Sequence, residues 1–133
     1  MATTTATLTI TSDISTDALA LTTTHTANKA GSTTGLEQTT GLAKKLYAAA
    51  QSNVTLISAG DYADNTASRV YVKNTGSSSL DYFTIELGAS NIVLGRLYGG
   101  DFAYLPYEGE QDIDISSTGT NMELEFMVIH EGA

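Results

Sequence analysis

The paired acidic residues are the side chains of this sequence best spaced to do chemistry together. Asp112 and Asp114 lie two apart in a stretch of alternating polarity, and so do Glu123 and Glu125 near the end of the chain. In a strand, residues two apart share a face, so each pair could contribute oxygen ligands to a calcium site. The calcium-loop pattern D-x-[DN]-x-[DN]-G is absent, however. A solvated acidic face that discourages sheet-edge pairing is therefore the favoured interpretation.

Nucleophiles and soft metal ligands are scarce. The chain has no cysteine, and its two histidines, His25 and His130, are far apart in the sequence. A zinc site would need carboxylate partners at a spacing that does not occur. The motifs G-x-S-x-G, G-x-x-x-x-G-K-[ST] and H-E-x-x-H are absent too. We therefore expect no enzyme activity, no cofactor and no bound metal.

The charge of the chain is acidic and unevenly distributed. Six Lys and Arg stand against fifteen Asp and Glu. Residues 1–45 hold three acids and three bases, whereas residues 46–133 hold twelve acids and only three bases. Because nucleic-acid affinity depends on Lys and Arg neutralising phosphates, neither nucleic acid nor an anionic membrane is an expected partner. The N-terminus also lacks the pattern of a secretory signal, and no apolar run approaches the ~18–20 residues of a membrane span.

From residue 41 onward the hydrophobic pattern has period two. Residues 42–50 are ambiguous between helix and strand, and a strand is preferred because the neighbouring segments are strands. The alternation predicts the other strands over residues 53–58, 68–74, 82–87, 92–98, 102–106, 112–116 and 122–128. Short strands at this spacing predict an all-β fold, a single jelly-roll-like β-sandwich of about eight strands with an extended N-terminal arm.

The N-terminal region has a different composition. Fifteen of the 21 threonines lie in the first forty residues, where residues 6–11 and 18–23 read as strands. Residues 24–40 show no periodicity and form either a disordered linker or an arm that becomes ordered against a neighbouring subunit. The arm is preferred because β-branched threonine favours extended backbone. We therefore predict a subunit-bridging arm over residues 1–45 and a β-sandwich body over residues 46–133.

Several residues are candidates for a subunit contact. Arg96 either pairs with a carboxylate such as Glu86 or Asp101, which is the favoured interpretation, or anchors an interface. Three tyrosines are predicted to gather near the same loops, where they line a protein interface or a sugar-binding face, or are half-buried packing. The candidate interface residues are Leu8, Ile10, His25, Lys29, Arg96, Tyr98, Tyr104 and Tyr107.

Three segments carry a resemblance to a known class of proteins. Residues 70–76 (VYVKNTG), 94–102 (LGRLYGGDF) and 123–133 (ELEFMVIHEGA) resemble small virion structural proteins of tailed bacteriophages, especially marine and cyanobacterial ones. The resemblance extends over residues 54–133. It implies a capsid cement or decoration protein that binds major capsid protein subunits in the virion, is assembled in the host cytoplasm and has no catalytic residues. A homo-oligomer, trimer or dimer, is expected. A neck, tail or host-adhesion component and a free carbohydrate-binding module remain the alternatives.

Overall fold

The computed structural model describes residues 2–131, and the regular structure in that range is β-strand apart from one 3-10 turn, η1 (Ala59–Asp61). The expected all-β class is confirmed, but the expected count of about eight strands is wrong. The eleven strands within residues 2–131 are β1 (Thr5–Ser12), β2 (Leu19–Thr26), β3 (Gln38–Thr39), β4 (Ala43–Tyr47), β5 (Gln51–Ile57), β6 (Ser68–Asn74), β7 (Tyr82–Leu87), β8 (Ile92–Tyr98), β9 (Phe102–Tyr107), β10 (Ile113–Ser117) and β11 (Met122–His130).

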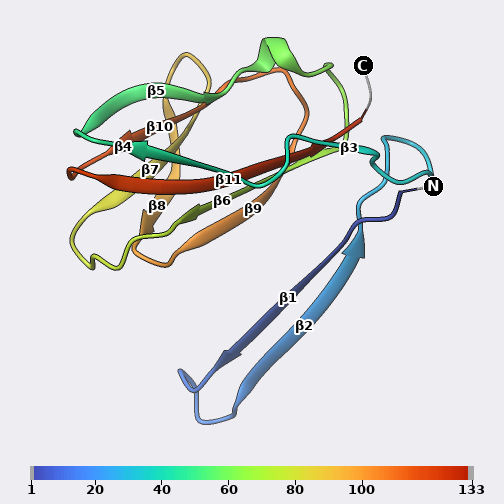
Figure 1. The fold of residues 1–133 in the computed structure, drawn as a ribbon. Coiled ribbons are helices and arrows are strands. Elements are labelled where there is room, and N and C mark those ends of the chain that lie inside the picture. The colour runs from blue at the N-terminus through green and yellow to red at the C-terminus, as the bar shows by residue number, and fades with distance from the viewer. Residues whose placement is uncertain (1, 132–133) are drawn as a thin grey trace.

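Nine of these strands form a body of two antiparallel sheets. One sheet has the order β5-β10-β7-β8, and the other has the order β3-β11-β6-β9. β4 also pairs with β11, so β3 and β4 occupy successive stretches of the same β11 edge. Figure 1 shows the two sheets lying one over the other. This arrangement is consistent with a β-sandwich, and the ambiguous residues 42–50 contain β4 and no helix.

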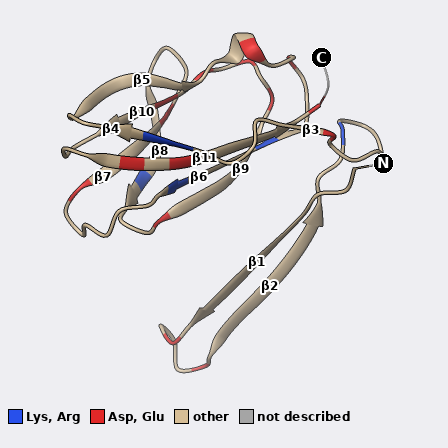
Figure 2. Ribbon diagram, in the orientation of Figure 1, with Lys and Arg blue, Asp and Glu red and all other residues tan. Residues whose placement is uncertain are grey.

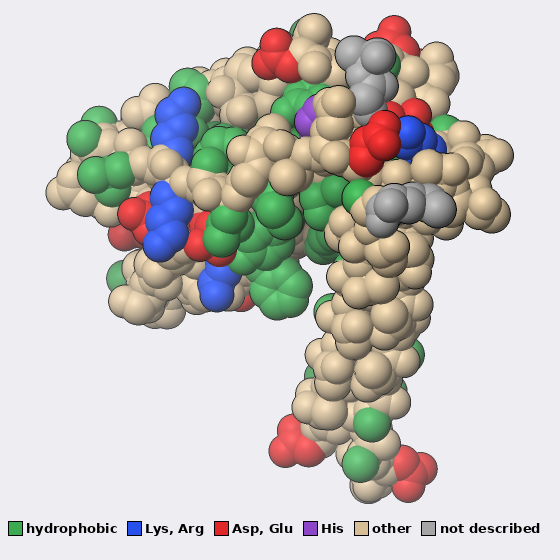
Figure 3. All heavy atoms as spheres, turned by 45° about the vertical axis from the view of Figure 1, so that its right-hand side comes forward, with side chains coloured by type: hydrophobic (Ala, Val, Ile, Leu, Met, Phe, Trp, Pro, Cys, Tyr) green, Lys and Arg blue, Asp and Glu red, His purple; other side chains and the backbone are tan. Residues whose placement is uncertain are grey.

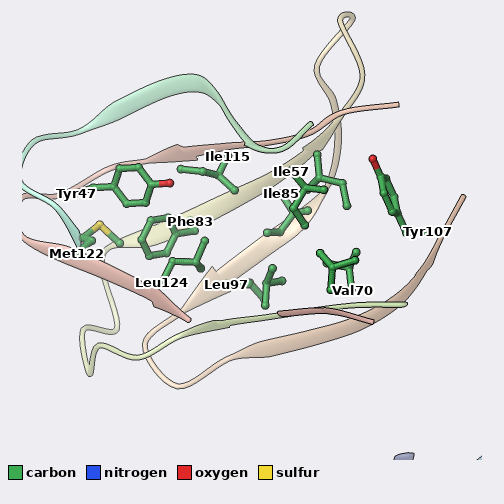
Figure 4. Close-up of a cluster of buried hydrophobic side chains, with 13 residues drawn as sticks. Tyr47, Ile57, Val70, Phe83, Ile85, Leu97, Tyr107, Ile115, Met122 and Leu124 are labelled. Carbon is green, nitrogen blue, oxygen red and sulfur yellow. The ribbon is translucent and has the colours of Figure 1, made fainter. Parts of the chain in front are cut away.

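The core lies between these two sheets because alternate residues of their strands point inward. β6 buries Val70 and Val72, and β7 buries Phe83, whose ring meets the ring of Tyr47 edge-on at 5.9 Å. Figure 4 shows Tyr47, Val70 and Phe83 among the side chains that converge from both sheets. Full burial of a large apolar side chain contributes about 1.5–3 kcal/mol. The body therefore has a hydrophobic core of its own.

A two-glycine turn carries the chain from one sheet to the other between β8 and β9. Gly100 has φ +88°, a backbone conformation that side-chain-bearing residues rarely adopt. A Cβ on Gly99 would lie 2.6 Å from the backbone of Ser77. Asp101 then donates its backbone N–H to the carbonyl of Tyr98. The turn predicted at this position thus requires both glycines.

β1 and β2 form an antiparallel hairpin that projects from the body (Figure 1). At its base, the N–H of Ala27 donates to the carbonyl of Thr4 at 2.9 Å. The following residues return to the body, where the buried side chains of Ala27 and Leu36 pack with Ile129 of β11. The predicted arm of residues 1–45 thus has two parts: residues 5–26 project, and residues 27–45 contact the chain's own body.

Within residues 2–131, no helix has the length and apolarity needed to cross a membrane.

Candidate functional site

The hairpin has two chemically different faces. Residues directly opposite each other in the β1–β2 register share a face, and Ile10 stands opposite Leu21. What we call the apolar face carries Ala6, Leu8, Ile10, Ser12, Leu19, Leu21, Thr23 and His25. What we call the threonine face carries Thr5, Thr7, Thr9, Thr11, Ala20, Thr22, Thr24 and Thr26. The alternation that builds a core in the body therefore builds an amphipathic ribbon here.

The apolar face is half exposed. Leu8 and Ile10 are each 41% exposed, and Leu19 and Leu21 are 53% and 47% exposed. β-branched threonines and a hydroxyl–hydroxyl bond of 2.9 Å between Thr7 and Thr24 support the strand pair. An isolated two-stranded hairpin is only marginally stable in water. Contiguous exposed apolar surface is typical of interaction sites, so this face is a candidate contact surface.

A groove of about 690 Å³ lies between the apolar face and the outer surface of β6 and β9. Leu8, Thr23 and His25 contribute to one wall, and Tyr71, Phe102 and Tyr104 contribute to the other. Figure 3 shows the hollow between the hairpin and the hydrophobic side chains of the body. His25 and Tyr104 join the two walls through a bond of 2.9 Å between Nε2 and the phenol oxygen. In the part of the chain that the structure describes, the groove lining holds no Asp, Glu, Lys or Arg.

Charged residues flank this surface, and Glu125 accepts the hydroxyl of the groove residue Tyr71. The two hairpin strands contain no ionisable residue except His25, and Asp13 and Asp17 lie in the turn at the tip (Figure 2). On the body, Arg69 and Lys73 lie two residues to either side of the groove residue Tyr71 on β6. An acidic tip and a basic margin thus flank an uncharged groove.

The tyrosines of the groove are held in the neutral form. Burial, followed by a hydrogen bond from its hydroxyl to Glu125 Oε1 at 2.9 Å, raises the pKa of Tyr71. Burial also raises the pKa of Tyr104, and nearby Arg69 opposes that shift. Both phenols therefore remain hydrogen-bonding groups without charge at neutral pH.

Of the candidate interface residues, four lie on this surface. Leu8, Ile10 and His25 belong to the apolar face, and Tyr104 lies across the groove from them. Lys29 lies beyond the hairpin in an ion pair with Glu37, with 2.7 Å between Nζ and Oε1. Tyr104 and His25 lie far apart in the sequence, but the fold brings their side chains into hydrogen-bond contact.

The ion pair expected for Arg96 is wrong. Its guanidinium lies over the ring of Tyr82, 4.3 Å from the centroid, and donates to the Tyr98 hydroxyl at 3.4 Å. Asp101 instead accepts the backbone N–H of Tyr98 at 3.0 Å. A cation over an aromatic face is favourable, and β7 and β8 place these three side chains on one exposed surface. This cluster belongs to the other sheet from the groove.

The expected gathering of three tyrosines is also wrong. Tyr98 lies against Tyr82 with the two rings tilted by 53°, Tyr104 lines the groove, and Tyr107 is buried in the core cluster. The hydroxyl of Tyr107 donates to the carbonyl of Gln111 at 2.9 Å. Burial, with smaller effects from nearby acidic groups, raises the pKa of Tyr107 to about 12. Tyr107 therefore packs within the body.

Asp112, Glu123 and Glu125 accept hydrogen bonds from distant parts of the chain, whereas Asp114 Oδ1 is buried without a hydrogen-bond partner among the described residues. Asp112 accepts the N–H of Ala59 at the start of η1, at 2.7 Å. Asp114 is 7% exposed and stands directly opposite Glu86 on β7, so the expected solvated face is wrong there. Glu123 accepts from the hydroxyl of Thr75. Among residues 2–131, no three His, Cys, Asp or Glu side chains are grouped so as to hold a metal ion.

The sequence interpretation missed several groove and hairpin residues. Leu19 and Leu21 alternate with Ala20 and Thr22, so the period-two pattern of the second strand could have identified them. Phe102 and Tyr71 could not have been found in this way, because their role depends on β6 and β9 facing the hairpin.

Comparisons with protein-family models, with curated proteins and with solved structures give no significant match to this chain.

Proposed function

We propose that this chain is a non-enzymatic structural subunit of a bacteriophage particle, a capsid cement or decoration protein that binds major capsid protein subunits. The observation that carries the proposal is the β1–β2 hairpin, which projects from the body with a half-exposed apolar face beside an uncharged groove. A surface of this kind recognises another polypeptide. The partner class is taken from the resemblance of residues 54–133 to phage virion proteins.

The division between body and hairpin supports a binding role. The body buries thirteen hydrophobic side chains in one cluster, and none of them belongs to the hairpin. The apolar face of the hairpin is half exposed, and at its base His25 is hydrogen-bonded to Tyr104 of the body. A partner that covers the rest of this face gains hydrophobic free energy of about 25 cal/mol per Å² of apolar surface.

The charge distribution supports the same role. Residues 46–133 carry all of the net charge of −9, whereas the hairpin strands carry no carboxylate or ammonium group. Exposed charges more than about 8 Å apart are largely screened at physiological salt. The hairpin can therefore lie across a neighbouring subunit while the acidic body stays in solvent.

A glycan-binding role in a neck, tail or host-adhesion component, or in a free carbohydrate-binding module, is the second candidate. The aromatic wall of the groove favours it, because Tyr71, Phe102 and Tyr104 offer ring surfaces beside a histidine. Aromatic rings with a polar group at one end suit surfaces that are partly apolar and partly wet. A glycan array with no binding would remove this candidate and leave the capsid role unaffected.

The test is a variant in which a two-glycine linker replaces residues 5–26. The bond between Thr4 and Ala27 shows that the two ends lie close enough to be joined. We expect the full chain to cosediment with phage heads that lack the protein, and the variant to stay folded by circular dichroism but remain in the supernatant. Binding by the hairpin-less variant as strong as that of the full chain would refute the proposal.

A second variant separates the apolar face from the mere presence of the hairpin. Replacing Leu8, Ile10, Leu19 and Leu21 by threonine keeps the strand propensity high and removes the apolar surface. We expect this variant to lose binding to the heads as completely as the deletion does. Retained binding would assign the contact to the threonine face instead.

A further inference from the structure

We propose that the groove beside the hairpin receives the hairpin of a second copy of this chain, so that two copies exchange hairpins across a two-fold axis. This inference deepens the proposed function and rests on it in taking the hairpin as the contact surface. The apolar faces of the two hairpins pack on each other, and the tip of each reaches the groove of the other. The dimer, whose paired hairpins bury their apolar faces on each other, is then the unit that meets the capsid. The loss of head binding expected for the apolar-face variants therefore follows from the loss of the dimer.

The chemistry of the groove selects the occupant. Its lining offers aromatic rings, leucine and threonine and no counter-charge, so a charged segment placed there would be desolvated without a partner. The strands of residues 5–12 and 19–26 contain no Asp, Glu, Lys or Arg and carry apolar residues on one face. The chain's own hairpin therefore has the composition that the groove accepts.

The charges at the two ends are complementary between copies. The tip of the hairpin carries Asp13 and Asp17, and Arg69 and Lys73 lie beside the groove on β6. Glu125 lies opposite Lys73 on β11 and accepts the hydroxyl of Tyr71. The uncharged strands of the second copy's hairpin fill the groove, and its two tip carboxylates lie at the basic margin outside the lining. This pairing of opposite charges fixes the direction of the contact.

The length of the hairpin allows two acidic bodies to associate. Eight residues per strand span about 27 Å at 3.4 Å per residue. The Debye length at physiological salt is about 8 Å, so bodies held apart by most of a hairpin length repel each other weakly. The net charge of −9 on each copy would oppose side-by-side packing of the bodies much more strongly.

The area of the hairpin faces indicates a reversible contact. A hairpin face about 27 Å long and about 10 Å wide covers roughly 270 Å². Two such faces bury roughly 540 Å², and the contacts with the two groove walls add to this, so the interface has the size of a weak, reversible contact. Two-fold exchange uses both surfaces of both copies, because every contact made by one copy is repeated by the other.

Sedimentation equilibrium of the full chain tests the association. We expect a monomer–dimer equilibrium for the natural sequence. Leu21→Asp should weaken the dimer by about 100-fold or more, because it places two unpaired carboxylates in an apolar contact. The matched control is Thr22→Asp, which adds the same charge on the threonine face and should change the dissociation constant by less than about threefold, or roughly 0.6 kcal/mol.

Cysteine pairs test the exchanged geometry, since the natural chain has no cysteine. Ser15→Cys at the hairpin tip and Phe102→Cys in the groove wall are made in separate chains and mixed under mild oxidation. We expect a disulfide between the two variants. Ser52→Cys, on exposed β5 of the other sheet, is the control partner and should not couple to Ser15→Cys at a comparable rate.

A natural chain that remains monomeric at every concentration would overturn the exchange, as would equal coupling of Ser15→Cys to residues 52 and 102. Cosedimentation with phage heads separates this result from the proposed function. A monomer that binds heads refutes the exchange and keeps the function, whereas a dimer that binds no heads keeps the exchange and refutes the function. Binding of heads by Leu21→Asp would assign the apolar face to another occupant.

Discussion

The body and the β1–β2 hairpin are built from the same period-two pattern, yet their apolar residues have opposite surroundings. In β6, Val70 and Val72 are fully buried against the opposite sheet. In the hairpin, Leu19 and Leu21 occupy equivalent alternate positions and are about half exposed. The difference teaches that alternation defines an apolar face, while a second layer decides whether that face becomes a core or a contact surface.

The largest expected loss of stability comes from a substitution in the core. Phe83→Ala should lower the free energy of unfolding by about 3–5 kcal/mol, because it leaves a cavity between the sheets. Leu21→Ala in the hairpin should lower it by less than about 0.5 kcal/mol in dilute, monomeric protein. Urea unfolding followed by circular dichroism measures both. Similar values for the two variants would contradict the division into body and hairpin.

The next largest loss of stability is expected from replacing the buried side-chain amide of Asn74. Asn74 donates to the carbonyl of Leu97 at 2.9 Å and accepts the N–H of Gly76 at 3.0 Å. Asn74→Ala leaves both groups without this partner and should cost about 2–3 kcal/mol. Gln38→Ala, at an exposed position in β3, is the control and should cost less than about 0.5 kcal/mol. Equal unfolding midpoints for the two variants would count against this account.

The pH dependence of stability separates the two regions as well. Because the pKa of Tyr107 is raised to about 12 in the folded body, the unfolded chain loses its proton first as the pH rises above 10. Stability from this group is complete below pH 10 and should fall by about 2 kcal/mol by pH 12. Urea midpoints measured across that range should fall less steeply in Tyr107→Phe. If the urea midpoints of Tyr107→Phe fell as steeply with pH as those of the natural chain, Tyr107 would be excluded as the cause of the loss of stability.

The smallest expected effect lies in the hairpin itself. Thr24→Ala removes the cross-strand bond to Thr7 and should weaken the strand pair by about 0.2–1 kcal/mol. Amide hydrogen exchange should therefore speed up in residues 5–26 and stay unchanged in β6 and β11, since the hairpin opens without the body. Faster exchange throughout the body would show that the two regions unfold together.

The boundaries of several body strands were predictable from the sequence. β6, β7 and β8 begin and end at the predicted residues. β6 and β7 alternate in polarity, and all three strands are bounded by turn formers. Residues 24–40 were less predictable. Thr24–Thr26 complete β2, and Leu36 packs on Ile129, nearly a hundred residues away. A local hydrophobic pattern cannot reveal a contact between residues so far apart in the sequence.

The candidate site was partly predictable for the same reason. Leu8 and Ile10 stand out by alternation alone, and so they were identified. Arg96 was expected to pair with a carboxylate, but β7 places Tyr82 beneath its guanidinium, and only the strand register reveals that neighbour. The cross-strand neighbours of a side chain depend on which strands pair and in which register. The sequence of a single strand does not reveal that pairing.

The sequence by itself determined that this protein is made of strands, since β-branched and alternating residues favour extended backbone. It also determined where the charge lies, because that is a property of composition alone. Only the tertiary structure decided which alternating segments face each other, and that the β1–β2 hairpin projects with Leu21 half exposed. The physical reason is that burial depends on what packs against a face, and those partners lie far away along the chain.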